Sequence, residues 1–120
     1  MLKKTITYTD YNGVSRTEDF YFNLTKAELI TMEATTEGGL QARLGKIIAA
    51  NDNVAVMNEF IKLIKMSYGV KSEDGRRFIK SEEISKEFME TEAYSEFLME
   101  LCTDDQAAAN FVNAVVPDLK

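Results

Sequence analysis

Four carboxylates in the C-terminal part of the chain recur every four residues: Glu92, Glu96, Glu100 and Asp104. Paired carboxylates can supply the acid and the base of glycoside hydrolysis. These four instead lie along one face of a predicted helix, and the chain has no Trp to act as a platform for a sugar. We therefore expect no glycosidase activity from them.

The residue inventory excludes most other catalytic chemistry. The chain has no His and one Cys, so it has no Ser–His or Cys–His nucleophile pair, and only carboxylates remain as zinc ligands. Cys102 follows Leu101 in an apolar run and is predicted to be a small buried residue. An enzyme would have to use Asp, Glu, Lys, Tyr or Arg. The sequence thus predicts a non-enzymatic protein without a cofactor or a metal.

A stretch rich in glycine and arginine, SYGVKSEDGRRFIKSEE, runs from Ser67 to Glu83. A phosphate-binding Walker loop requires Gly-Lys-Ser/Thr at the start of a helix, and no Lys-Ser/Thr follows the glycine of EDGRR. Two acids before a glycine are also too few for a calcium loop. This stretch therefore predicts no ligand-binding loop.

The same stretch predicts a small hairpin or turn about Gly75. Val70 faces either Phe78 or Ile79 across it, and the sequence leaves both registers open. Two arginines beside the turn are either solvated or in contact with a partner: Arg76 and Arg77.

The acidic row also has two interpretations. Steps of four residues on a helix drift by only about 40°, so neighbouring carboxylates face each other. Like charges at this spacing destabilise a helix by about 0.2–0.5 kcal/mol per pair. The row is either a solvated face that keeps the protein soluble or a docking face for a basic helix or a neighbouring subunit.

Charge is distributed unevenly along the chain. Residues 1–80 carry 12 basic and 10 acidic side chains, and residues 81–120 carry 2 and 10, so the two parts have net charges of +2 and −8. An acidic C-terminal third favours basic partners over nucleic acid. No apolar run approaches the roughly 20 residues of a membrane span. Lys3 and Lys4 lead into polar threonines, so we expect no secretory signal. We expect no binding to nucleic acid or to a membrane.

The first 24 residues predict a β-hairpin with its turn at DYNG. A two-residue Asn12–Gly13 loop would split the apolar residues between the two faces. A three-residue loop closes Asp10 onto Val14, with Gly13 in the left-handed position, and is the one we predict. This loop places the apolar residues of both strands on one face, which must pack on helices or on another subunit. Two aromatic residues on this face, Phe20 and Phe22, are candidates for partner contact.

Helical periodicity follows the hairpin. A capping box of Thr25 and Glu28 opens the first helix, which runs to about Thr35. Two further helices are predicted at about residues 40–50 and 54–68; the second has Met57, Phe60, Ile61, Ile64 and Tyr68 on its apolar side and Glu59, Lys62 and Lys65 opposite.

The C-terminal part predicts two or three more helices. Ser81 caps the first, and Thr91 either caps another or lies within a continuous helix. A capping box of Thr103 and Gln106 opens the last, which ends before Pro117.

The sequence predicts a mainly α fold with a small N-terminal antiparallel β-hairpin (α+β) and a compact bundle of about five to six helices. We expect a single domain over residues 1–120. Its parts are a hairpin, a first helical part, a turn or short hairpin, and an acidic helical part: residues 1–24, 25–68, 69–80 and 81–120.

Three segments together resemble the small tail assembly chaperones of long-tailed, siphovirus-type bacteriophages of Gram-positive bacteria. They are SYGVKSEDGRRFIKSEE, the following TEAYSEFLMELCTDDQAAANFVNAVVP, and the N-terminal YTDYNGVSRTEDFYFNLTKAEL. The resemblance covers nearly the whole chain and rests on its overall residue pattern, not on a catalytic motif. It implies a non-enzymatic protein that binds and solubilises the phage tape measure protein and contacts the tail tube protein. It also implies action in the host cytoplasm, release before the mature virion, and a short form beside a frameshift-extended one.

Self-association is a further expectation, because an exposed hairpin edge invites pairing between subunits. Two other functions stay open. One is a small acidic inhibitor that mimics nucleic acid and blocks a host or defence enzyme. The other is a structural tail component that is retained in the particle.

Overall fold

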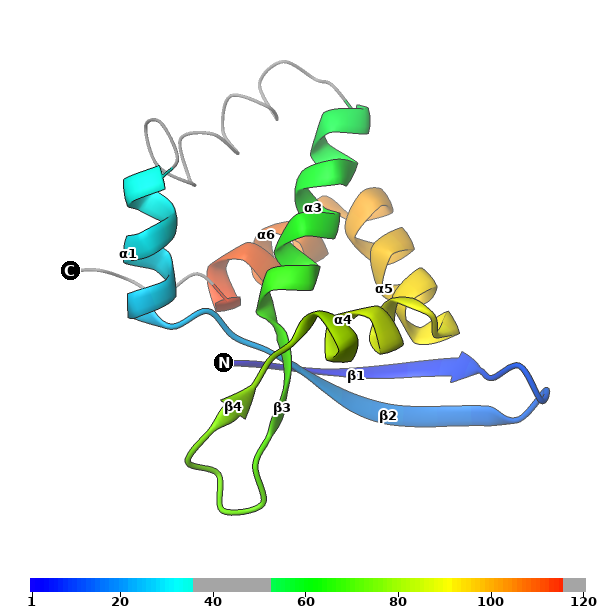
Figure 1. The fold of residues 1–120 in the computed structure, drawn as a ribbon. Helices are drawn as coiled ribbons and strands as arrows, with labels where there is room; N and C mark the ends of the chain where they lie inside the picture. Colours follow the sequence, from blue (N-terminus) through cyan, green and yellow to red (C-terminus); the bar gives the residue numbers. More distant parts are fainter. Residues whose placement is uncertain (36–52, 116–120) are drawn as a thin grey trace.

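The computed structural model describes residues 1–35 and 53–115. The described elements, labelled as in Figure 1, are β1 (Leu2–Thr9), β2 (Ser15–Phe22), α1 (Lys26–Thr35), α3 (Asn53–Ser67), β3 (Tyr68–Lys71), β4 (Phe78–Ile79), α4 (Glu82–Met89), α5 (Glu92–Thr103) and α6 (Asp105–Val115). The predicted α+β class, mainly helical with an N-terminal hairpin, is confirmed. The helix predicted at residues 40–50 and the end of the last helix at Pro117 lie outside the described residues.

The N-terminal hairpin has the predicted three-residue turn. The Asp10 N–H donates to the Val14 carbonyl at 2.9 Å, and Gly13 adopts a φ of 79°. Leu2 consequently pairs with Phe22, and the helix-facing side of β1 and β2 holds the apolar side chains. The turn residues and the one-sided apolar pattern demand the same register, which is why local sequence sufficed to predict it.

The N-terminal ends of the helices follow the predicted capping chemistry in three cases. Thr25 and Glu28 exchange backbone-to-side-chain hydrogen bonds of 3.0 and 3.1 Å at the start of α1. Ser81 accepts from the Ile84 N–H and opens α4, and Thr91 caps a separate α5. The capping box predicted at Thr103 is wrong, because the Asp104 carboxylate accepts the hydrogen bonds at the start of α6 instead.

The stretch around Gly75 folds as a second hairpin that joins the first one. Strand β3 follows α3 without a loop and pairs with the end of β2, so the sheet order is β1-β2-β3-β4. Val70 pairs with Ile79, which decides between the two predicted registers. A Cβ on Gly69 would lie 2.7 Å from the Phe78 ring, so glycine is needed for this close approach. Figure 1 shows β3 and β4 extending away from the helices.

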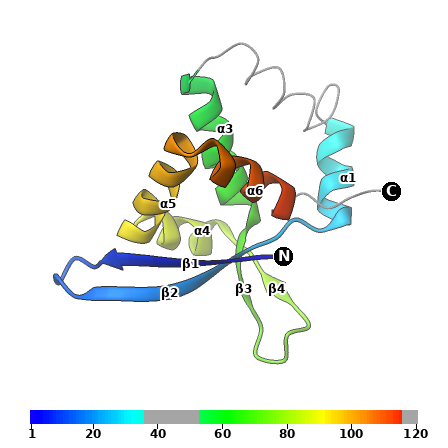
Figure 2. The ribbon, with the colours of Figure 1, turned by 180° about the vertical axis from the view of Figure 1, so that it is seen from behind.

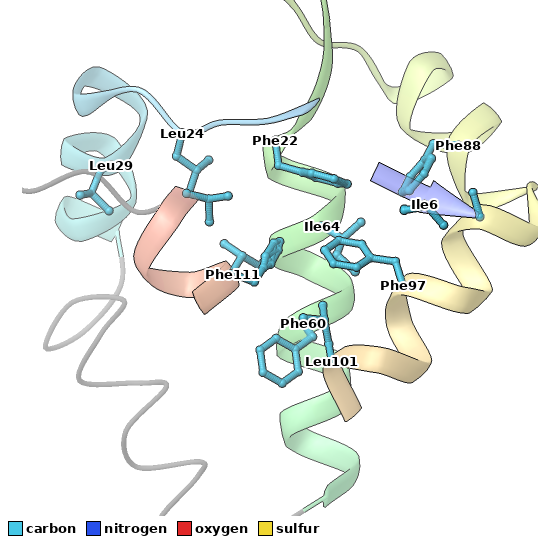
Figure 3. Packing of buried hydrophobic residues seen from close by; sticks show 13 residues of the cluster. Ile6, Phe22, Leu24, Leu29, Phe60, Ile64, Phe88, Phe97, Leu101 and Phe111 are labelled. Carbon is cyan, nitrogen blue, oxygen red and sulfur yellow. The ribbon is translucent and has the colours of Figure 1, made fainter. Parts of the chain in front are cut away.

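The helices gather on one side of the β1–β2 hairpin, as Figures 1 and 2 show from opposite directions. A single cluster of buried residues joins them to the hairpin (Figure 3). Phe22 is central to it, with its ring centroid 5.0 Å from that of Phe97 and 5.6 Å from that of Phe111. The cluster thus contains side chains from strands and helices far apart in the sequence.

Three expectations about burial are wrong. Met57 was predicted on the apolar side of α3 but is 37% exposed. Glu59 was predicted on the exposed side of α3 but is only 8% exposed, and the buried face of this helix is formed by Phe60, Leu63, Ile64 and Ser67. Ser67 can occupy a core position because its hydroxyl donates to the Leu63 carbonyl at 2.6 Å. Cys102 is exposed rather than buried, because the core-facing residue of that turn of α5 is Leu101.

Candidate functional site

The acidic row lies on α5, which packs along the edge strand β1. The Glu100 carboxylate forms an ion pair with the Lys4 Nζ at 2.8 Å. Glu92, at the other end of the helix, accepts a hydrogen bond from Tyr11 in the hairpin turn, which raises the pKa of that tyrosine. These two contacts show that α5 runs antiparallel to β1, with the row facing the strand's side of the helix.

Asp104 is separate from the other three acids. It follows the last residue of α5 with extended backbone angles (φ −126°, ψ 104°). Its carboxylate accepts hydrogen bonds from the N–H groups of Gln106 and Ala107 at 3.0 and 3.2 Å. A carboxylate at a helix N-terminus satisfies otherwise unpaired N–H groups and interacts favourably with the helix dipole. Asp104 is therefore the N-cap of α6.

A groove of about 360 Å³ lies between β1 and α5. Glu96 is exposed at this groove and makes no ion pair among the described residues. Met99 also lines it and is 63% exposed, so the groove combines an unpaired charge with an adaptable apolar side chain. The remaining lining residues come from β1 and the same helix: Lys4, Thr5, Ile6, Thr7, Phe97, Glu100 and Thr103.

The two aromatic candidates on the hairpin face the helices. Phe22 has no exposed surface, and its ring is surrounded by those of Tyr68, Phe88, Phe97 and Phe111. Phe20 is half-buried, with its ring centroid 5.1 Å from that of Phe88. In this structure both rings attach the hairpin to the helices, and Phe22 presents no surface to a partner.

The two arginine candidates lie at the turn between β3 and β4. Both are exposed, and the Asp74 carboxylate accepts hydrogen bonds from the Arg76 N–H and the Ser72 hydroxyl within the turn, which lowers the pKa of Asp74. Strands β4 and β1 are at opposite ends of the strand order. The structure therefore does not bring Arg76 and Arg77 together with the acidic row.

Lys80 makes structural contacts that the hydrophobic periodicity of the sequence did not indicate. Its ammonium group donates to the Asn23 carbonyl at 2.6 Å and to both carboxylate oxygens of Glu28 at 2.8 and 2.9 Å. Burial would raise the pKa of Glu28, but the hydrogen bonds from Lys80 and from the Thr25 N–H hold it below its ordinary value. Lys80 thereby connects the second hairpin to the start of α1.

A second groove, of about 420 Å³, lies between α3 and the start of α4. Lys62, Lys65 and Lys80 line it together with the half-exposed Met66. Lys62 lies 3.7 Å from the carboxylate of Glu59. The lining also includes Ser81, Glu82 and Ser85. This groove was not predicted, because its residues come from α3 and from the segment at the start of α4, which are brought together only by packing.

The described part of the chain has no group of three or more Cys, Asp or Glu side chains placed to hold a metal ion. None of the helices within residues 1–35 and 53–115 is long and apolar enough to cross a membrane. The surface of the described residues carries the acidic row and exposed methionines such as Met66 and Met99, which suit contacts with other proteins.

The comparison with known protein families agrees with a role in contacts with other proteins. A family model described as phage tail assembly chaperone matches residues 1–119. Since the match covers nearly the whole sequence, the chain belongs to the phage tail assembly chaperone family. The role of this family is a non-enzymatic one in assembly. No curated protein and no solved structure matched the chain.

Proposed function

We propose that this protein binds and solubilises the tape measure protein of its phage and helps to recruit the tail tube protein. It acts in the cytoplasm of the infected bacterium and leaves before the virion matures. The phage is long-tailed and infects a Gram-positive host. The observation that carries the proposal is the family match over residues 1–119.

The surface that we assign to client binding is the exposed part of the acidic row. Glu96 offers a charge without a cationic partner among the described residues, and Met99 beside it exposes most of its side chain. An amphipathic helix can lay its apolar side on such a surface while its basic side chains meet the acids. A long helical tape measure protein with basic segments would suit this surface.

Co-expression tests the proposal. The tape measure protein is expressed alone, with this chain, and with an unrelated acidic protein of similar size as a control. We expect tape measure protein in the soluble fraction, co-purifying with this chain, only in the second case. Insoluble tape measure protein in all three cases would refute the chaperone function.

Analysis of purified virions separates the chaperone from a structural tail component. We expect mass spectrometry to detect the tail tube protein but not this chain in virions, because a chaperone is released during assembly. A fixed copy number of this chain per virion would instead identify a structural component.

A further inference from the structure

Strands β3 and β4 form a hairpin that extends away from the helices (Figures 1 and 2). Its outer segment, residues 72–77, contributes no side chain to the buried cluster that joins the other elements. The residues from Glu73 to Arg77 are all exposed. Packing in the core therefore does not explain why this segment has a defined shape.

Hydrogen bonds within the turn hold that shape. The Ser72 N–H donates to the Arg77 carbonyl at 2.9 Å, and Gly75 adopts a φ of 73°. The Asp74 carboxylate accepts from the Arg76 N–H at 3.1 Å and from the Ser72 hydroxyl at 2.7 Å. The Ser72 hydroxyl oxygen also accepts from the Arg77 N–H at 3.1 Å. These bonds use the backbone of both arginines, so the two guanidinium groups take no part in them.

Contacts at the base of the hairpin hold its direction. The Lys71 Nζ lies 4.4 Å from the centroid of the Tyr21 ring on β2. After β4, Lys80 donates to the Asn23 carbonyl and to the Glu28 carboxylate. A turn with a fixed shape on a fixed base loses little conformational freedom when it binds, and this preorganisation favours affinity.

Arg76 and Arg77 are the cations that the hairpin presents. Neither forms an ion pair among the described residues. Arginine pairs well with carboxylates at protein interfaces, because its planar group donates two parallel hydrogen bonds. Val70 on β3 is 46% exposed and adds an apolar contact to the two charges.

We propose that the β3–β4 hairpin docks on an acidic surface of a partner protein, with Arg76 and Arg77 paired to its carboxylates. A protein suits the hairpin better than a nucleic acid does. Glu73 is exposed on the same turn and the chain has a net charge of −6, so a continuous row of phosphates would meet like charges beside the arginines. A protein surface can place its carboxylates opposite the arginines alone.

The hairpin is separate from the surface that we assign to the tape measure protein. The acidic row lies along β1, and β4 is at the opposite end of the strand order. Two surfaces of opposite charge suit two different partners. The inference rests on the proposed function in one respect, because it takes the tail tube protein as the partner of the hairpin.

Calorimetric titration of the full chain with purified tail tube protein tests the arginines. Arg76→Gln combined with Arg77→Gln removes two charges and keeps every backbone bond of the turn. We expect at least about tenfold weaker binding, because charge-assisted hydrogen bonds are lost. Lys26→Gln combined with Lys86→Gln is the matched control: it changes the net charge equally at two other exposed residues and should change the affinity less than about twofold.

Asp74→Ala separates preorganisation from charge. This variant makes the turn more positive but removes the hydrogen bonds to the Arg76 N–H and the Ser72 hydroxyl. We expect binding to weaken by about threefold or more, because the turn loses its fixed shape. Equal or tighter binding would overturn the preorganised hairpin. Circular dichroism should show each variant folded as the wild type, because residues 72–77 lie outside the buried cluster.

The remaining outcomes distinguish this inference from the proposed function. Unchanged binding of tail tube protein by the double glutamine variant would overturn the inference and leave the proposed function intact. A wild type that binds the tape measure protein but not the tail tube protein would do the same. A wild type that binds neither protein would refute both. A single-stranded oligonucleotide that binds the wild type but not the double glutamine variant would assign the hairpin to phosphates instead.

Discussion

At the scale of single residues, Phe22 shows how burial changes an interpretation. Its sequence position on an apolar hairpin face made it a candidate for partner contact. In the structure its ring touches four aromatic residues from β3, α4, α5 and α6, and none of it is exposed. Phe22 is therefore an anchor between the hairpin and the helices.

Phe22→Ala should reduce the free energy of unfolding by about 3–5 kcal/mol, because it removes a fully buried ring and leaves a cavity. Urea titration followed by circular dichroism measures this loss. Ile30→Ala, at a residue of α1 that is 57% exposed, should change the free energy by less than about 0.5 kcal/mol. A loss below about 1 kcal/mol for Phe22→Ala would contradict this packing.

Glu96 and Glu100 are a matched pair for the acidic row. Glu96→Gln removes like-charge repulsion with its neighbours four residues away and should stabilise the isolated protein by about 0.4–1 kcal/mol. Glu100→Gln should stabilise the protein less or not at all, because it also removes the ion pair with Lys4.

We expect Glu96→Gln to weaken binding of the tape measure protein. Stabilisation with unchanged binding would exclude this row as the docking face.

At the scale of elements, the second hairpin is attached through a few specific contacts. Strand β3 pairs with β2 at Gly69, and Lys80 after β4 connects to Asn23 and Glu28. The capping box of α1 could be predicted because its residues are three positions apart. The connection of Lys80 to Glu28 spans 52 residues, and no local pattern indicates it.

The lowered pKa of Glu28 gives this connection a pH dependence. The ordinary value is 4.5, so as pH falls past it the unfolded chain binds the proton before the folded protein does. The contribution to stability is thus present above about pH 4.5 and is lost as pH falls through the lower folded value.

Lys80→Met tests this contribution. We expect a loss of about 1–2 kcal/mol in the free energy of unfolding at pH 7. The difference from the wild type should be smaller at pH 3 than at pH 7, because protonation of Glu28 as pH falls below its ordinary pKa of 4.5 removes the ionic part of the connection, whereas the bond to Asn23 is still lost in the variant. Urea titrations at the two pH values measure it, and a difference that is constant with pH would exclude the ionic connection.

At the scale of the whole molecule, the hairpin register and the α+β class could be predicted from sequence. Both depend on local turn chemistry and on apolar patterns of one face. The four-stranded sheet could not be predicted from sequence, because the pairing of Tyr21 with Gly69 joins segments far apart in the chain. The same holds for the groove beside the acidic row, whose two walls are β1 and α5.

The function that we propose for the whole molecule is to hold a long client in soluble form. The most direct test is light scattering after purified tape measure protein is diluted from denaturant into increasing amounts of this chain. We predict that scattering falls with added chain and levels off at a fixed molar ratio, whereas an equal amount of an unrelated acidic protein leaves it unchanged. Scattering that does not respond to this chain at any ratio would contradict a chaperone that binds the tape measure protein.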